Sequence, residues 1–165
     1  MMKSIKTLFF VSFLAICSLI CTGCEGGYDC ALDNIAYNRV KFYTINGYDK
    51  EVEYAFPEPL TASLMVNGRD SIVVNYVTNA KELTLPMSYT SNCDTVVLNF
   101  FDRHYDTLYI SHDNIPIYQS MECGVIMHHR VTGTRHTGSF IDSMAIKNAN
   151  VNFDHNENIK LYFVE

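Results

Sequence analysis

Apolar and polar residues alternate along most of the chain from Asn38 onward, with turn residues between the alternating runs. A period of two predicts half-buried β-strands, and almost no stretch has the period of a helix. Asn46-Gly47 and Asn67-Gly68 each follow an alternating run, which is a strong hairpin signal. The strands are expected around these apolar positions: Val40 and Phe42; Ala62, Leu64 and Val66; Ile72, Val74 and Tyr76; Leu83 and Leu85; Val96, Leu98 and Phe100; Leu108 and Ile110; Ile117; Val125 and Met127; Met144 and Ile146; Ile159, Leu161 and Phe163.

About nine or ten short strands separated by turn signals are typical of an all-β antiparallel β-sandwich, immunoglobulin-like or transthyretin-like. A β-barrel is the alternative. A parallel α/β fold is disfavoured, because no segment between strands reads as a crossover helix. No composition shift divides this region, so we expect a single domain over residues 30–165.

Composition and charge narrow the class of protein. The chain has 165 residues, of which 48% are apolar and 18% charged, and this balance excludes a disordered chain. The net charge of −6 argues against a nucleic-acid partner, because nucleic-acid-binding domains carry clustered basic residues.

The first segment predicts export. Lys3 and Lys6 precede an uncharged run over residues 7–20, which is too short to span a bilayer and has the form of a signal peptide. The run ends in Cys21-Thr22-Gly23-Cys24, which resembles the lipobox of bacterial lipoproteins, with Cys21 in place of the usual Leu. The alternative is an ordinary N-terminal helix or strand.

The lipobox resemblance implies a signal peptide over residues 1–23 and a lipidated Cys24. Residues 24–29 would then be the lipidated cysteine and a short tether. The partner is a lipid bilayer reached through acylated Cys24, with palmitate among its acyl chains. The expected location is the outer membrane, at its periplasmic face or at the cell surface.

Besides the lipidated Cys24, three cysteines remain after removal of the signal peptide. Cys30 and Cys123 lie beside loop-like residues, whereas Cys93 heads an apolar strand and could be a buried thiol. Disulfides persist in exported proteins, and we therefore predict a bond between Cys30 and Cys123. The alternative is that all three are reduced core residues.

Several short motifs stand out along the chain: Cys24, Cys30, Arg39-Val40-Lys41-Phe42-Tyr43, Asp106-Thr107-Leu108, Glu122-Cys123-Gly124 and the closing segment over residues 158–163. Together they resemble a family of small lipoproteins of unknown function from Bacteroidales-type bacteria. The resemblance supports the lipid anchor and the Cys30–Cys123 pair. It implies no activity.

Four triplets read Asp, Ser or Thr, apolar, and look like the O-glycosylation tripeptide of exported proteins in such bacteria. Their hydroxyl residues are Ser71, Thr95, Thr107 and Ser143. The alternative is that Asp closes a turn, Ser or Thr opens a strand and the apolar residue faces the core.

No catalytic, cofactor or metal site is predicted. The chain has no Gly-x-Ser-x-Gly elbow, phosphate loop or dinucleotide fingerprint. His128 and His129 are adjacent, so in a strand they point to opposite faces. The remaining histidines, which we place in solvated turns, are His104, His112, His136 and His155.

Tyrosine is the remaining candidate for binding. Tyr43, Tyr109 and Tyr162 fall on the face opposite the apolar residues of their strands and could bind a glycan or a peptide. The alternative is that they cover the outer face of a sheet. The sequence therefore favours a non-enzymatic interaction or structural module of the cell envelope, with another envelope protein or a glycan as partner. A small envelope hydrolase is the less favoured reading.

Overall fold

The computed structural model describes residues 30, 35–47, 50–66, 68–101, 104–121, 123–138 and 140–163. The chain divides into two units, Met1–Leu32 and Asp33–Glu165, and the fold is that of the second unit. The described residues form eleven strands and no helix. The signal peptide, Cys24 and the tether lie outside the described residues.

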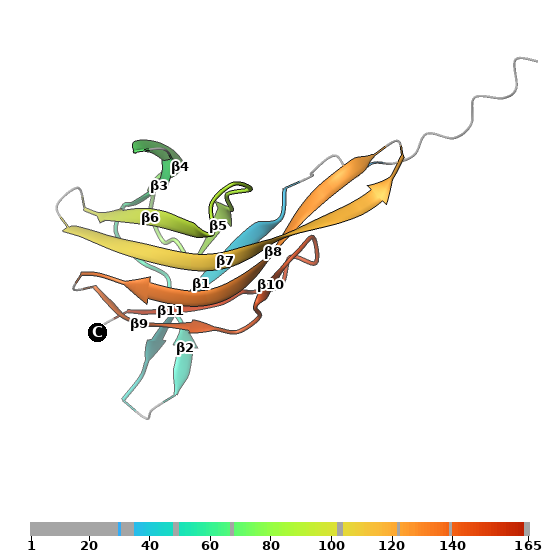
Figure 1. Ribbon diagram of the computed structural model, residues 1–165. Helices are drawn as coiled ribbons and strands as arrows, with labels where there is room; N and C mark the ends of the chain where they lie inside the picture. Colours follow the sequence, from blue (N-terminus) through green and yellow to red (C-terminus); the bar gives the residue numbers. More distant parts are fainter. Residues whose placement is uncertain are drawn as a thin grey trace, which may run out of the picture. The chain divides into compact units, whose positions relative to one another are not determined.

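The strands form two packed sheets (Figure 1), which confirms the predicted β-sandwich. The six-stranded sheet has the order β10 (Asn150–Val151), β8 (Gly124–His136), β7 (His104–Ser120), β6 (Cys93–Phe100), β3 (Leu60–Val66), β4 (Arg69–Val77). The five-stranded sheet has the order β2 (Glu51–Glu53), β1 (Tyr37–Ile45), β11 (Ile159–Phe163), β9 (Ile141–Ile146), with β5 (Glu82–Pro86) also on β1.

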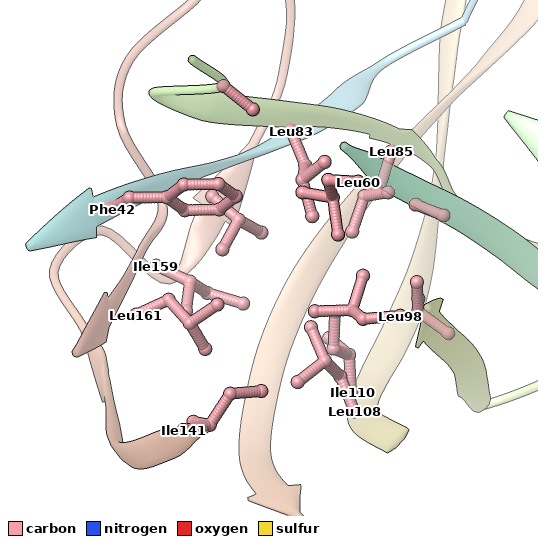
Figure 2. Packing of buried hydrophobic residues seen from close by; sticks show 14 of the residues in the cluster. Phe42, Leu60, Leu83, Leu85, Leu98, Leu108, Ile110, Ile141, Ile159 and Leu161 are labelled. Atoms are coloured by element: carbon pink, nitrogen blue, oxygen red, sulfur yellow. The ribbon is translucent and has the colours of Figure 1, made fainter. Parts of the chain in front are cut away.

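The core lies between the two sheets, and alternation along each strand decides which side chains enter it. In β6 every second residue is buried, and Val96, Leu98 and Phe100 are fully enclosed. Phe42, Ile159 and Leu161 come from the facing sheet, and Figure 2 shows how these side chains meet those of β3, β6 and β7. Burial of such side chains contributes roughly 1.5–3 kcal/mol each, which makes this core the main stabilising element.

The predicted hairpin at Asn46-Gly47 is present between β1 and β2. The backbone N–H of Asn46 donates to the Lys50 carbonyl at 3.0 Å, and the N–H of Lys50 donates to Asn46 Oδ1 at 3.0 Å. At the second signal, Gly68 has a φ of 74° between β3 and β4, a conformation that favours glycine.

Two features depart from the simple antiparallel prediction. β1 pairs in parallel with β11, so the two ends of the domain meet in the middle of one sheet. The segments expected as separate strands around Leu108 and Ile117 are one strand, β7, of 17 residues. β7 continues through Pro116 because β8 pairs with it as far as Ser120. The pairing of β7 with β6 ends at Ser111, so Pro116 has only one neighbouring strand and its missing N–H interrupts no ladder with β6.

A buried carboxylate fixes the connection between β8 and β9. Asp106 is 1% exposed, and its Oδ2 accepts backbone N–H groups from Phe140 at 3.1 Å and Ile141 at 3.0 Å. Gly138 has a φ of 105°, and a Cβ at this position would lie 1.5 Å from Asp106 Oδ1. Only glycine lets the backbone pass this close to the carboxylate.

We expect Gly138→Ala to destabilise the domain by more than about 2 kcal/mol, because it adds both a clash and backbone strain. Urea unfolding measures the change. Gly47→Ala is the matched control, since Gly47 has open space around its Cβ position and no positive φ. Equal unfolding midpoints for the two variants would contradict the account of the Asp106 contact.

Candidate functional site

The β7–β8 hairpin extends beyond the other strands as a two-stranded arm (Figure 1). Asn114 and His129 form its base, where they pair with each other across the hairpin. From this point β6 no longer pairs with β7, and β10 pairs with β8 only at His129 and Arg130. We call residues 115–121 and 124–128 the arm. A two-stranded ribbon in water is marginally stable by itself, so its base and tip need additional support.

Apolar side chains are exposed along the arm. Tyr118 and Val125 are direct cross-strand partners and are 63% and 60% exposed. Met121, in the turn, is 89% exposed. Between Asp113 and Arg130 the sequence has one charged residue, Glu122. An exposed apolar surface with so few charges is typical of a surface that contacts an apolar partner.

A buried polar cluster lies at the base of the arm. His112 of β7 is 1% exposed, and its Nε2 lies 3.1 Å from Oδ2 of Asp94 in β6. Both oxygens of Asp94 also accept the backbone N–H of Ser88, at 3.3 and 3.2 Å. Asp94 therefore connects the loop between β5 and β6 to the hairpin that carries the arm.

A second set of contacts also connects the loop between β5 and β6 to the hairpin. His129 Nδ1 lies 2.7 Å from Asn114 Oδ1, and the Asn114 Nδ2 group donates to the Ser91 carbonyl at 3.1 Å. The Tyr89 ring stacks on His129 with centroids 5.7 Å apart. The same loop is thus held against both strands at the base of the arm.

Two ring nitrogens of this cluster have no hydrogen-bond partner, and both imidazoles are shielded from solvent. His129 is 1% exposed and its Nε2 has no partner, and His112 Nδ1 is likewise unpartnered. Burial, followed by the nearby His112, lowers the pKa of His129 from 6.5 to about 4. The imidazole of His129 is therefore neutral at pH 7, and a proton on it would be a buried charge next to a second imidazole 5.2 Å away.

A cavity of about 300 Å³ opens beside this cluster. Asp94 and Cys93 line it from β6, and Ser88, Thr90 and Ser91 line it from the loop. The hydroxyls of Ser88 and Ser91 already accept backbone N–H groups within that loop. Most of the polar lining is thus used to hold the loop in shape.

The sequence placed His112 in a solvated turn, and that prediction was wrong. Ser111, His112 and Asp113 resemble a turn in composition, but β8 provides β7 with a partner through this stretch. Cys93 also differs from the expected buried thiol, because it is exposed. The run of 16 residues with a single charge was the sequence signal for the arm, and the prediction of a separate strand around Ile117 missed it.

The three candidate tyrosines do not share a face. Tyr43 and Tyr162 are partners in the five-stranded sheet, with ring centroids 5.9 Å apart, whereas Tyr109 lies in β7 of the other sheet. Tyr43 is only 7% exposed.

Charged residues of the same chain already contact the side chains of these three tyrosines. Tyr162 Oη donates to Glu51 Oε2 at 2.6 Å, while Lys160 pairs with Glu51 and lies 4.8 Å from the centroid of the Tyr43 ring. Burial and the bond to Glu51 raise the pKa of Tyr162 to about 12. The Arg135 guanidinium lies 4.1 Å from the centroid of the Tyr109 ring.

The four glycosylation triplets differ in accessibility. Asp94 and Asp106, the first residues of the Thr95 and Thr107 triplets, are buried and bonded to backbone N–H groups. Ser143 donates to Asp142 at 3.0 Å. Ser71 is exposed, and Ile72 is 60% exposed rather than facing the core. Glycosylation stays a prediction, and Ser71 is its most accessible site.

Cys30 and Cys123 are both disulfide-bonded, which supports the predicted pairing of these two residues. Among the residues described, no group of three potential ligands from His, Cys, Asp and Glu gathers to hold a metal ion. Within that same part of the chain, no helix has the length and hydropathy needed to cross a membrane.

Comparison with known proteins places most of this domain in one family. The model of a family of unknown function (DUF6452) matches residues 60–163, which covers the chain from β3 to the end of β11. No curated protein and no solved structure matches the chain significantly.

The buried His129 predicts a pH dependence of stability. Its folded pKa of about 4 lies below the usual 6.5, so the unfolded chain binds a proton more readily between these values. Stability should therefore fall by about 3 kcal/mol as the pH drops from 6.5 to 4. His129→Phe keeps an aromatic ring against Tyr89 and should remove this part of the dependence of unfolding free energy on pH. Urea unfolding across the pH range measures it, and an identical slope in both proteins would contradict the assignment.

Proposed function

Since the chain belongs to a family of unknown function, DUF6452, we propose its role from its own residues: a lipid-anchored protein of the cell envelope that acts as a non-enzymatic interaction module. The observation that carries this proposal is the β7–β8 arm. It presents Tyr118, Val125 and Met121 to solvent, while the polar cluster at its base holds it against the loop between β5 and β6.

The N-terminal sequence supports the anchor. A basic start, an uncharged run and the segment Cys21-Thr22-Gly23-Cys24 together match a lipoprotein signal. The acyl chains on Cys24 would hold the protein, since the full sequence already has a net charge of −6 and loss of Lys3 and Lys6 makes it more acidic, so an anionic lipid surface does not attract it.

The pairing of the N-terminal segment with β8 supports the disulfide. Ile35 forms a parallel bridge with Met127. Cys30 lies five residues before Ile35, and Cys123 lies four residues before Met127, in the same chain direction. Five residues reach at most about 17 Å, and four residues of strand span roughly 13 Å, so a bond between the two cysteines is within reach.

Glycan binding and a hydrolase activity are less well supported. The tyrosines nominated for a glycan face are separated between two sheets and contacted by charged residues of the chain. The Asp94–His112 pair is bonded to the loop that it holds in place.

The anchor is tested by Cys24→Ala in the full-length protein. We expect the variant to stay unprocessed or to leave the membrane fraction, because no thiol remains to carry lipid. Fractionation with mass spectrometry of the N-terminus measures this, and Cys93→Ser is the matched cysteine control. A Cys24→Ala protein that is cleaved before residue 24 and still sediments with membranes would contradict the proposal.

The disulfide has its own test. Removal of a bond that closes a loop of about 90 residues should cost on the order of 4 kcal/mol. Cys30→Ser, Cys123→Ser and the double variant should therefore have the same lowered stability, while Cys93→Ser should match the wild type. Non-reducing peptide mapping should recover Cys30 and Cys123 in one joined peptide. Free thiols at both positions would reject the pairing.

A further inference from the structure

The tip of the arm presents an exposed apolar surface. Met121 is 89% exposed in the turn, next to the exposed cross-strand pair of Tyr118 and Val125. Between Asp113 and Arg130 the single charged residue is Glu122, next to Met121 in the sequence, so the surface can enter a lipid only as far as this carboxylate stays hydrated. The question is which partner covers it.

The chain that precedes the domain points to the bilayer. Cys24 lies six residues before Cys30, and six residues reach at most about 20 Å. Cys30 is disulfide-bonded, as is Cys123, which lies two residues after Met121. With the two cysteines joined, the shortest covalent path from the lipid to the folded domain passes through the tip of the arm and not through the start of β1.

We propose that the tip of the arm, with Met121, Tyr118 and Val125, contacts the lipid surface and enters its interfacial layer. This inference rests on the proposed lipid anchor and adds the second contact. Tyrosine suits the boundary between headgroups and acyl chains, because its ring is apolar and its hydroxyl is polar. Six residues of strand extend about 20 Å, and a membrane-spanning strand needs more, so the arm dips into the surface without crossing it.

The location of the charged residues fits a shallow contact. Asp113 and Arg130 stand at the base of the arm and pair across the hairpin. No charged residue lies between this base and Met121, and Glu122, which follows Met121 in the sequence, is the single charge of the arm. A carboxylate at this position has to stay with the headgroups, so the contact is confined to the interfacial layer.

A single tryptophan reports this contact directly, because the chain contains no tryptophan of its own. The full-length protein would be produced as Met121→Trp, processed in its host and reconstituted in phosphatidylcholine vesicles with and without brominated acyl chains. Tyr118→Trp is a second reporter on the same surface. Ile72→Trp is the matched control, because Ile72 is 60% exposed on β4, at the edge of the sheet away from β8.

We expect the emission of Met121→Trp and Tyr118→Trp to shift to the blue on vesicles and to be quenched by brominated lipid. Ile72→Trp should keep the emission of a water-exposed indole. Vesicle-bound protein with water-like emission at positions 121 and 118 would overturn the inference and leave the anchor intact. Equal quenching at position 72 would indicate general adsorption and would also overturn it.

Two further outcomes separate the alternatives. Protein that does not associate with vesicles at all would be a failure of the proposed anchor and would be seen before any fluorescence is measured. A blue shift at position 121 in native envelopes but not in pure vesicles would assign the arm to a protein partner and would reject the bilayer as its occupant.

Discussion

The pairing of β7 with β8 is the interaction on which the rest of the domain depends. Its register runs from Leu108 opposite His136 to Ser120 opposite Gly124. The first half of this ladder lies inside the six-stranded sheet, where Leu108, Ile110 and Val131 enter the core. In the second half, which becomes the arm, no other strand of the described residues pairs with the hairpin beyond its base, and Ile35 adds an isolated bridge to Met127. One hairpin thus joins part of the buried core to an exposed apolar surface.

The boundary between these halves is polar for a physical reason. The apolar core ends where β6 and β10 stop pairing with the hairpin, and a loop covers the opening. Asp94 and Asn114 supply that loop with acceptors and donors, and His112 and His129 complete the contacts. Buried polar groups with unsatisfied atoms cost stability, about 1–3 kcal/mol each, so the cluster lowers stability in return for a fixed loop and a fixed arm direction.

The sequence predicted the sandwich because alternation and Asn-Gly turns are local signals. It could not predict the parallel pairing of β1 with β11, since Val40 and Ile159 are far apart in the chain and both read only as strand residues. His112 was misread because a polar triplet inside a strand looks like a turn until its partner strand is known. The separation of Ile117 from Leu108 and Ile110 failed for a related reason: Pro116 lies between them, and a proline is tolerated where a strand has lost one neighbour. The separation of Tyr43 from Tyr109 likewise depends on which sheet each strand joins.

The central claim is that the domain contacts its membrane through the tip of the arm as well as through the lipid on Cys24. Neutron reflectometry of the lipidated protein on a supported bilayer tests this most directly, because it measures protein density along the membrane normal. The account predicts protein density that overlaps the headgroup layer and continues without a break into the β-sandwich. A hydrated gap between the bilayer surface and the domain, crossed only by the short tether, would contradict it.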